Sequence, residues 1–172
     1  MERKKGGEMK KFTLDTFVTH LEEVIASYPA REKLLLEEIG HLVKDKAKKK
    51  IGHLQPGWDP LSPSTILDKE RKGFDFNGDH NPLYRNGKLL HSIESGVVGK
   101  TAVVGSTEDT AVWQELGTVG QHPIPPRPFL STAMFESVSK ILSGIKEWFG
   151  NTIQKKKIST NKLRTHVETY QP

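Results

Sequence analysis

The segment IPPRPFL at residues 124–130 constrains the fold more than any other stretch of the sequence. Proline fixes φ and lacks a backbone N–H, so this run cannot lie inside a helix or a central strand. It is followed at once by apolar residues at helical spacing, which predict one long helix from Pro128 to Gly150. The chain therefore requires a stiff loop that sets the angle at which its final helix leaves the rest of the fold. The apolar positions of this helix are Leu130, Met134, Val138, Ile141, Leu142, Ile145, Trp148 and Phe149.

Helical periodicity also dominates the N-terminal third of the chain. Apolar residues recur at helical spacing from Leu14 to Ile25, and Tyr28-Pro29 is expected to end this first helix because proline disfavours a helical residue before it. A second helix is predicted from about Arg31 to Lys50, with Gly52 as its stop.

The central part of the chain is punctuated by turn residues. Ser62-Pro63 is a cap with a first-turn proline and predicts a short helix over 64–72, followed by a mobile loop over 73–82. The pair Asn86-Gly87 predicts a turn, and the alternation that follows it from Leu89 to Val97 favours a strand. Gly99-Lys100 between two β-branched runs predicts a hairpin. Residues 110–116 fit either a strand or a short helix.

These elements predict an α+β fold with N-terminal helices, a small antiparallel β-sheet and a long C-terminal helix packed on the sheet. We expect one domain over residues 12–150, a disordered basic tail over 1–11 and a polar tail over 151–172.

Composition excludes several classes of site. The 172 residues include no cysteine, which excludes disulfides, thiolate metal sites and cysteine nucleophiles. No apolar run approaches the length of a membrane helix, and no signal peptide is expected. The net charge of +5 is concentrated in lysine clusters, which are either solvated ends or a candidate interaction surface for phosphates or an acidic partner. These candidates are Lys48, Lys49, Lys50, Lys155, Lys156 and Lys157.

Catalytic patterns are weak. The chain has no HExxH, GxSxG or Walker sequence, so we predict no catalytic residue, no metal and no cofactor. Two alternatives stay open. Asp75, Asp79 and His80 could hold a divalent cation in a small metal-dependent hydrolase. Alternatively, the lysine clusters and the tryptophans at 58, 113 and 148 could bind nucleic acid through phosphates and stacked bases.

Five short pieces occur in a distinctive order between residues 34 and 149. They are WDPLS with Thr65, then Leu83 with NGKL and Ser92-Ile93, then VVG at 103–105, then Ala111 with QELGT, and last IPPRPFL. This succession resembles the phage virion morphogenesis family, the Mu-like tail-completion proteins. The resemblance implies a non-enzymatic structural protein of a tailed phage or prophage that completes the tail or joins it to the head. It further implies other tail or neck proteins as partners, a homo-oligomeric ring, and location in the virion and, during assembly, in the host bacterial cytoplasm.

Within this pattern we assign architectural roles to the most distinctive residues. Arg127 can bind several carbonyls or a carboxylate at once, and we expect it to fasten its loop to the QELG turn with Glu115 as partner. The alternative is that Arg127 faces a neighbouring subunit. Trp58 and Leu61 are expected to cover the sheet or a helix end, and Gly87 and Gly117 to supply turn conformations. The complete motif set is Trp58, Leu61, Gly87, Leu89, Ser92, Gln114, Gly117, Pro125, Arg127, Pro128 and Phe129.

Overall fold

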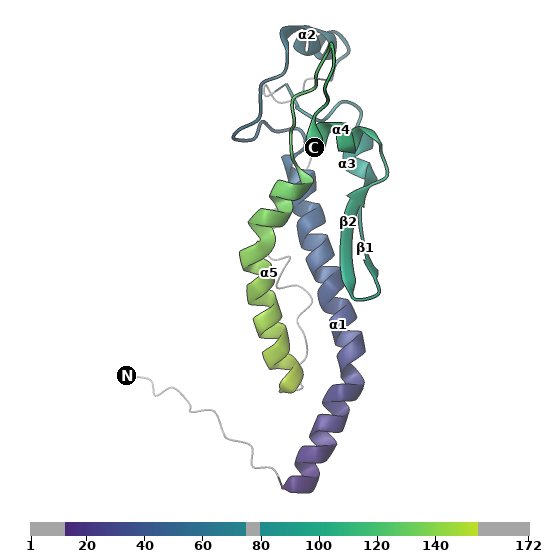
Figure 1. Ribbon diagram of the computed structural model, residues 1–172, viewed down its shortest axis with the longest axis vertical. Helices are drawn as coiled ribbons and strands as arrows, with labels where there is room; N and C mark the ends of the chain where they lie inside the picture. Colours follow the sequence, from purple (N-terminus) through teal and green to yellow (C-terminus); the bar gives the residue numbers. More distant parts are fainter. Residues whose placement is uncertain (1–12, 75–79, 155–172) are drawn as a thin grey trace, which may run out of the picture.

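A computed structural model describes residues 13–74 and 80–154 of the chain (Figure 1). The predicted class is confirmed: the protein is α+β, with helices, a two-stranded antiparallel sheet and a long C-terminal helix. The elements in chain order are α1 (Leu14–Lys50), α2 (Pro63–Arg71), α3 (Lys88–Ser92), β1 (Ile93–Val98), β2 (Thr101–Ser106), α4 (Thr110–Leu116) and α5 (Leu130–Ile153). The expected tails at 1–11 and beyond 154 lie outside the described residues.

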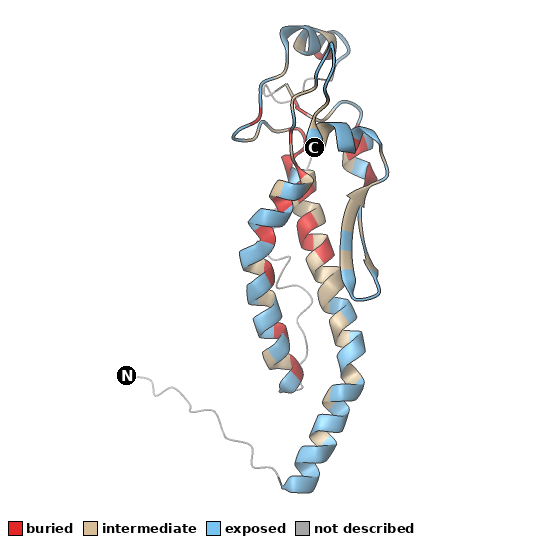
Figure 2. Ribbon diagram, in the orientation of Figure 1, coloured by how far each residue is buried: buried red, intermediate tan, exposed pale blue. Residues whose placement is uncertain are grey.

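The long helix α1 is the axis of the molecule. Helix α5 runs antiparallel along one side of it, and the β1–β2 hairpin lies along the other (Figure 1). Buried residues gather where the C-terminal half of α1 meets these two elements and the loop before α5 (Figure 2). Ala47 of α1, Ile93 of β1 and Ala133 of α5 belong to this one hydrophobic core.

The hairpin is in the register that its turn dictates. Val98 pairs with Thr101 and Ile93 with Ser106, and Gly99 supplies a φ of 59° in the connection. The sheet lies close to α1 because Gly40 has no side chain. A Cβ at Gly40 would be 3.2 Å from the Cβ of Ser95. The predicted hairpin is thus confirmed, and a glycine on α1 sets its distance from the helix.

One side of α5 packs against α1. Its buried residues recur every four or seven positions and include Ala133 and Ser137, whose small size lets the two helices approach closely. At the other end of α5, Trp148 donates a hydrogen bond from Nε1 to the carbonyl of Arg31 at 3.0 Å, and its ring meets Tyr28 edge-on at 5.4 Å. These contacts fix the register of the two helices.

The predicted break at Tyr28-Pro29 is wrong, because α1 continues through Pro29 as a single helix of 37 residues. Proline removes one backbone hydrogen bond, but contacts with α5 hold the helix together on both sides of it. Upstream, His20 Nε2 lies 2.8 Å from the carbonyl oxygen of Ile153. Downstream, Trp148 binds Arg31. Tertiary packing therefore overrides the local preference.

The segment after Asn86-Gly87 also differs from the sequence prediction. Residues 88–92 form the helix α3 rather than a strand, because Gly87 at φ 77° and the Asn86 side chain, which accepts from Lys88 N at 3.1 Å, begin a helical turn. Leu89, Ser92 and Ile93 are buried at i, i+3 and i+4, a spacing that the alternation had obscured.

The structure also defines the remaining helices, α4, α5 and α2. Residues 110–116, which fitted either element, form the helix α4. Helix α5 does not stop at Gly150 but continues to Ile153, so residues 151–153 belong to the folded domain rather than to a tail. The buried side chain of Thr152 explains this extension. The short helix begun by Ser62 is confirmed as α2, with Ser62 Oγ accepting from Thr65 N at 3.3 Å.

Candidate functional site

Arg127 stands at the centre of the loop that leads into α5. Its side chain is only 5% exposed, and Nη2 donates to the carbonyl oxygens of Asp59 at 3.0 Å and Pro60 at 3.3 Å. Its backbone N–H donates to the carbonyl of Gln114 at 2.6 Å. Arg127 therefore ties together three segments that are far apart in the sequence: the WDPLS stretch, α4 and the proline-rich loop.

The expected pairing of Arg127 with Glu115 is wrong. The Glu115 carboxylate instead accepts hydrogen bonds from the backbone nitrogens of Phe129 and Leu130 through Oε2, at 2.8 and 2.9 Å, and from Ser131 through Oε1 at 2.8 Å. These are the unpaired N–H groups at the start of α5, and a carboxylate there also complements the helix dipole. Glu115 is thus a capping residue supplied from α4.

Gly117 allows the QELG turn to lie against the proline-rich loop. Its φ is 75°, and a Cβ at this position would lie 2.8 Å from the carbonyl oxygen of Ile124 and 3.0 Å from the ring of Pro126. Thr118 completes the junction, because its backbone N–H donates to Ile124 O and its Oγ1 accepts from Ile124 N, both at 2.9 Å. The predicted turn role of Gly117 is confirmed, and that of Gly87 by its own positive φ.

The remaining motif residues are buried or half-buried. Trp58, Leu89, Ser92 and Phe129 are buried, and Phe129 is among the largest fully buried side chains. Ser92 Oγ donates to Leu89 O at 2.8 Å and lies 2.7 Å from Ser106 Oγ. Pro128 was expected in the first turn of α5, but it precedes the N-cap residue Phe129. Leu61, Pro125 and Pro128 are half-buried.

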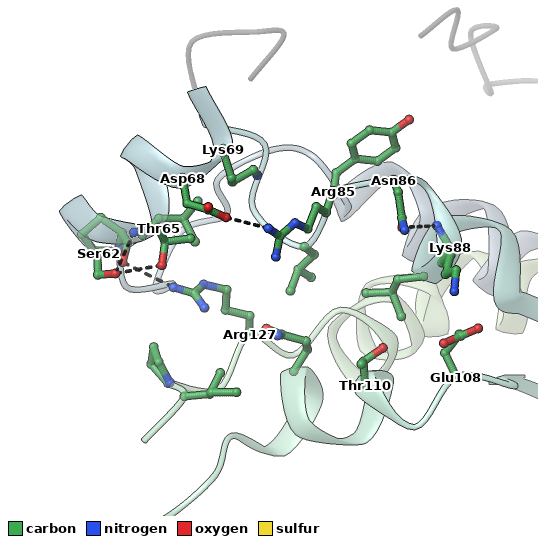
Figure 3. Close-up of a pocket in the computed structure, with 18 of the residues that line it drawn as sticks. Ser62, Thr65, Asp68, Lys69, Arg85, Asn86, Lys88, Glu108, Thr110 and Arg127 are labelled. Carbon is green, nitrogen blue, oxygen red and sulfur yellow. Dashed lines mark hydrogen bonds and ion pairs between the residues drawn. The ribbon is translucent and has the colours of Figure 1, made fainter. Parts of the chain in front are cut away.

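A pocket of about 750 Å³ opens between α2, α4 and the proline-rich loop (Figure 3). Part of its wall is apolar and comes from Leu61, Leu83, Leu89 and the loop residues 123–125. Arg127, Gln114 and Thr65 contribute polar groups to the same space. Sequence reasoning did not predict this pocket, because its walls come from segments that meet only in the folded chain.

The rim of the pocket carries an ion-pair network centred on Asp68. Its carboxylate lies 2.6 Å from Arg85, 2.7 Å from Lys72 and 3.2 Å from Arg71. The pKa of Asp68 is lowered chiefly by the hydrogen bond from Lys72; burial opposes this effect, and the charges of Lys72 and Arg85 and the hydrogen bond from Arg71 lower the pKa further. Burial lowers the pKa of Arg127, and the charge of Asp59 opposes that effect.

Two described polar atoms in the pocket wall lack partners. Arg127 Nε and Gln114 Oε1 are both buried, and neither has a hydrogen-bond partner within residues 13–74 and 80–154. Buried donors and acceptors are nearly always paired in proteins, so these two atoms, which are sealed from the open space of the pocket, are unusual.

The loop before α3, expected to be mobile over 73–82, is held firmly at its described end. The buried Lys69 side chain donates to the carbonyls of His80 and Asn81, and Asn81 Nδ2 donates to Phe74 O at 2.9 Å. Asp75 and Asp79 of the candidate metal site lie outside the described residues. Among the residues that are described, no cluster of three potential metal ligands occurs.

The basic end of α1 is only partly available as a surface. Lys50 is buried and its Nζ lies 2.6 Å from Glu136 Oε1 of α5, while Lys49 is exposed and Lys48 half-buried. Lys155, Lys156 and Lys157 lie beyond the described part of the chain. Lys50 is therefore a bridge between helices, a role that its position in a lysine run did not indicate.

Exposed large apolar side chains are most numerous on two helices, α1 and α5. On α5 they form a second stripe beside the one that packs on α1, and on α1 they line the N-terminal turns. The α5 set is Met134, Phe135, Val138, Leu142, Ile145, Phe149 and Ile153, and the α1 set is Leu14, Phe17, Val18, Leu21, Ile25 and Tyr28. In the described helices, no segment is both long and apolar enough for a membrane span.

Comparison with known proteins adds no assignment. No protein-family description, no curated protein and no solved structure matches this chain.

Proposed function

We propose that this protein is a non-enzymatic assembly subunit of a tailed phage or prophage, which completes the tail or joins it to the head. The resemblance to the virion morphogenesis family rests on five short pieces in order. Three of them, WDPLS, QELGT and IPPRPFL, form one hydrogen-bonded unit through Arg127, Glu115 and Thr118. This convergence supports the proposal, since pieces matched by chance would have no reason to contact one another.

The observation that carries an assembly role is the exposed apolar stripe of α5. Seven large apolar side chains along this helix are between 38% and 76% exposed. Together they leave on the order of 600 Å² of apolar surface uncovered, which is large for a monomer. The α1 set, with six side chains that are 39% to 78% exposed, leaves an apolar area of the same order, so each stripe approaches the roughly 800 Å² per partner of a standard-size interface.

We assign this surface to a second copy of the chain. The two stripes lie on different helices of one subunit, so the α1 stripe of one copy can meet the α5 stripe of the next. Contacts between unlike patches generate rings or filaments rather than closed pairs, which agrees with a ring at the tail end. Other tail or neck proteins are the further partners in this proposal.

The role in the particle is tested by deleting the gene from the phage or prophage that encodes the chain. Lysates examined by electron microscopy should contain heads and tails that are unjoined or tails of abnormal length. Particles of normal form and infectivity after the deletion would overturn the proposal.

The interface is tested with the double variant Leu142→Glu, Phe149→Glu. Both side chains are more than half exposed, so the variant should fold normally but fail to restore particles to the deletion strain. Light scattering should show weaker self-association at matched concentration. The control is Ser139→Glu, Ser143→Glu on the same helix, whose side chains are also exposed and which should behave as the wild type.

A further inference from the structure

We propose that the outer edge of β2 pairs with the same edge of a second copy of the chain, so that two hairpins join into one four-stranded antiparallel sheet. The hairpin lies along α1 on the side away from α5 (Figure 1). The pairing uses no residue of the α1 or α5 stripe. It is therefore a second contact, which does not depend on the proposed function.

The outer edge of β2 presents backbone groups that have no partner in the described chain. The sheet formed by the described residues has two strands, so no strand lies beside β2 on its outer side. The two-residue turn makes Val98–Thr101 a hydrogen-bonded pair, and such pairs alternate along an antiparallel ladder. Val103 therefore bonds to β1, whereas the N–H and C=O groups of Ala102 and Val104 point away from it. No other described segment donates to or accepts from these groups, which form a template for another strand.

Neither strand carries the features that usually protect an edge. Natural sheets protect their edges with lysine, proline, a β-bulge or an inward-pointing charge. Both strands lack lysine and proline, and six consecutive residue pairs leave no bulge between them. Glu94 gives β1 one charge, whereas β2, with the sequence TAVVGS, has none. The β2 edge can therefore be extended without bringing like charges together.

The sequence of β2 is complementary to itself, and this makes a second copy the occupant. An antiparallel pairing centred on Val103 places the Val103 side chains of the two copies opposite each other, on the face of the sheet away from α1. In the single chain this side chain is 47% exposed. Opposed β-branched side chains stabilise antiparallel strands. The same register places Ala102 opposite Val104 and Thr101 opposite Gly105, so every position is uncharged.

The symmetry of the contact limits its size. Each copy contributes the same edge, so the contact is two-fold and closes after two copies. Such a pair covers the two edges that are most open to further strands. The α1 and α5 stripes, in contrast, are unlike patches and can continue into a ring. We therefore assign the β2 pair to the protein in solution.

Disulfide cross-linking tests the register, because the chain contains no cysteine. The Cα atoms of a non-hydrogen-bonded antiparallel pair are about 4.5 Å apart, a distance that a disulfide spans. Under mild oxidation of the full chain, Val103→Cys should therefore form a linked pair at least about tenfold faster than Val98→Cys, because paired thiols have a high effective concentration. Val98 is the control, since it lies on the same face and is 70% exposed. It belongs to β1, at least about 14 Å from its copy in the proposed sheet.

Charge substitution provides a second readout. Val103→Lys places two ammonium groups opposite each other and should yield single chains in sedimentation velocity, whereas Val98→Lys should leave the pair intact. The amides of Ala102 and Val104 should exchange hydrogen at least about tenfold faster in Val103→Lys than in the wild type. The amide of Gly105, which bonds to β1, should be unchanged and shows that the hairpin is folded.

Two results would overturn the proposal. One is equal cross-linking of Val103→Cys and Val98→Cys at the same concentration. The other is exchange at Ala102 and Val104 that is the same in the wild type and in Val103→Lys. Neither result bears on the role in the particle, which the gene deletion tests separately.

Discussion

The Oε2 atom of Glu115 lies 2.8 Å from the backbone nitrogen of Phe129, so the last helix of the fold begins on a carboxylate supplied by the preceding helix. Phe129 is fully buried, and its position fixes where α5 enters the core. Residues 124–129 are held by hydrogen bonds at both ends, from Thr118 at Ile124 and from Glu115 at Phe129. The proline-rich loop is stiff by composition and is also anchored by these contacts.

Replacing Glu115 by alanine should destabilise the domain by about 1–3 kcal/mol, because three N–H groups of α5 lose a charged acceptor. Glu115→Gln, which keeps one acceptor oxygen, should cost less. Urea unfolding followed by circular dichroism measures both. Glu70→Ala, at an exposed position of α2, serves as the control and should change stability by less than about 0.5 kcal/mol. Equal effects at Glu115 and Glu70 would contradict the capping role.

Gly117→Ala should cost about 2–4 kcal/mol, because the new Cβ meets Ile124 O at 2.8 Å in addition to the strain of a positive φ. Gly73→Ala separates the two effects. Gly73 has a similar φ of 69° but no atom within 4 Å of the added Cβ, so only the backbone strain of about 1 kcal/mol applies. Thermal and chemical unfolding of the pair should therefore differ clearly. Similar losses at both positions would show that the close approach does not matter.

Arg127→Ala should destabilise the domain by about 2–4 kcal/mol, since it removes the bonds to Asp59 and Pro60 from a buried site. Arg127→Lys keeps the charge but loses the planar fork, and should recover only part of the loss. Arg71→Ala, whose ion pair with Asp68 is exposed, should cost less than about 0.5 kcal/mol. Unchanged stability with lost association would instead place Arg127 at a subunit contact.

The sequence predicted correctly those elements that are determined by residues close to them in the chain. The Ser62 cap, the Gly99 turn and the apolar period of α5 each lie within a few residues of the structure that they specify. The sequence could also identify Arg127 as an anchor, because a buried guanidinium needs several acceptors. The sequence could not show which acceptors Arg127 binds, because the segments that contain Asp59 and Glu115 both offer oxygen atoms and only the fold decides which of them lies near the guanidinium.

The errors have a common physical origin in long-range contacts. Pro29 is a helix breaker by local preference, but Trp148, more than a hundred residues away, holds the helix through it. The position of Lys50 in a run of lysines indicates a surface residue, but in the folded chain Lys50 pairs with Glu136 across the α1–α5 contact. The pocket also depends on long-range contacts, because its walls join four separate segments of the chain.

The pKa of Asp68 provides a pH test of the rim network. Its pKa is lowered in the folded protein, chiefly by the hydrogen bond from Lys72. The stabilisation it provides is therefore present above the unfolded pKa, near the ordinary value of 3.8, and is lost as pH falls through the lower folded value. Wild type should unfold at a higher temperature than Asp68→Asn at pH 7, and the difference should shrink below about pH 4. A difference that is constant from pH 7 to pH 2.5 would contradict this linkage.

Pro29→Ala should stabilise the domain by about 1–3 kcal/mol, because alanine restores an N–H for the carbonyl of Ile25 within a continuous helix. The matched variant is Ala30→Gly at the next, exposed position. It should cost about 1 kcal/mol if residue 30 is inside a helix and almost nothing if the helix ends at Tyr28. Urea unfolding distinguishes the two cases. If Pro29→Ala were destabilising and Ala30→Gly neutral, α1 would consist of two helices joined by a rigid break, and the register set by Tyr28 and Trp148 would need another explanation.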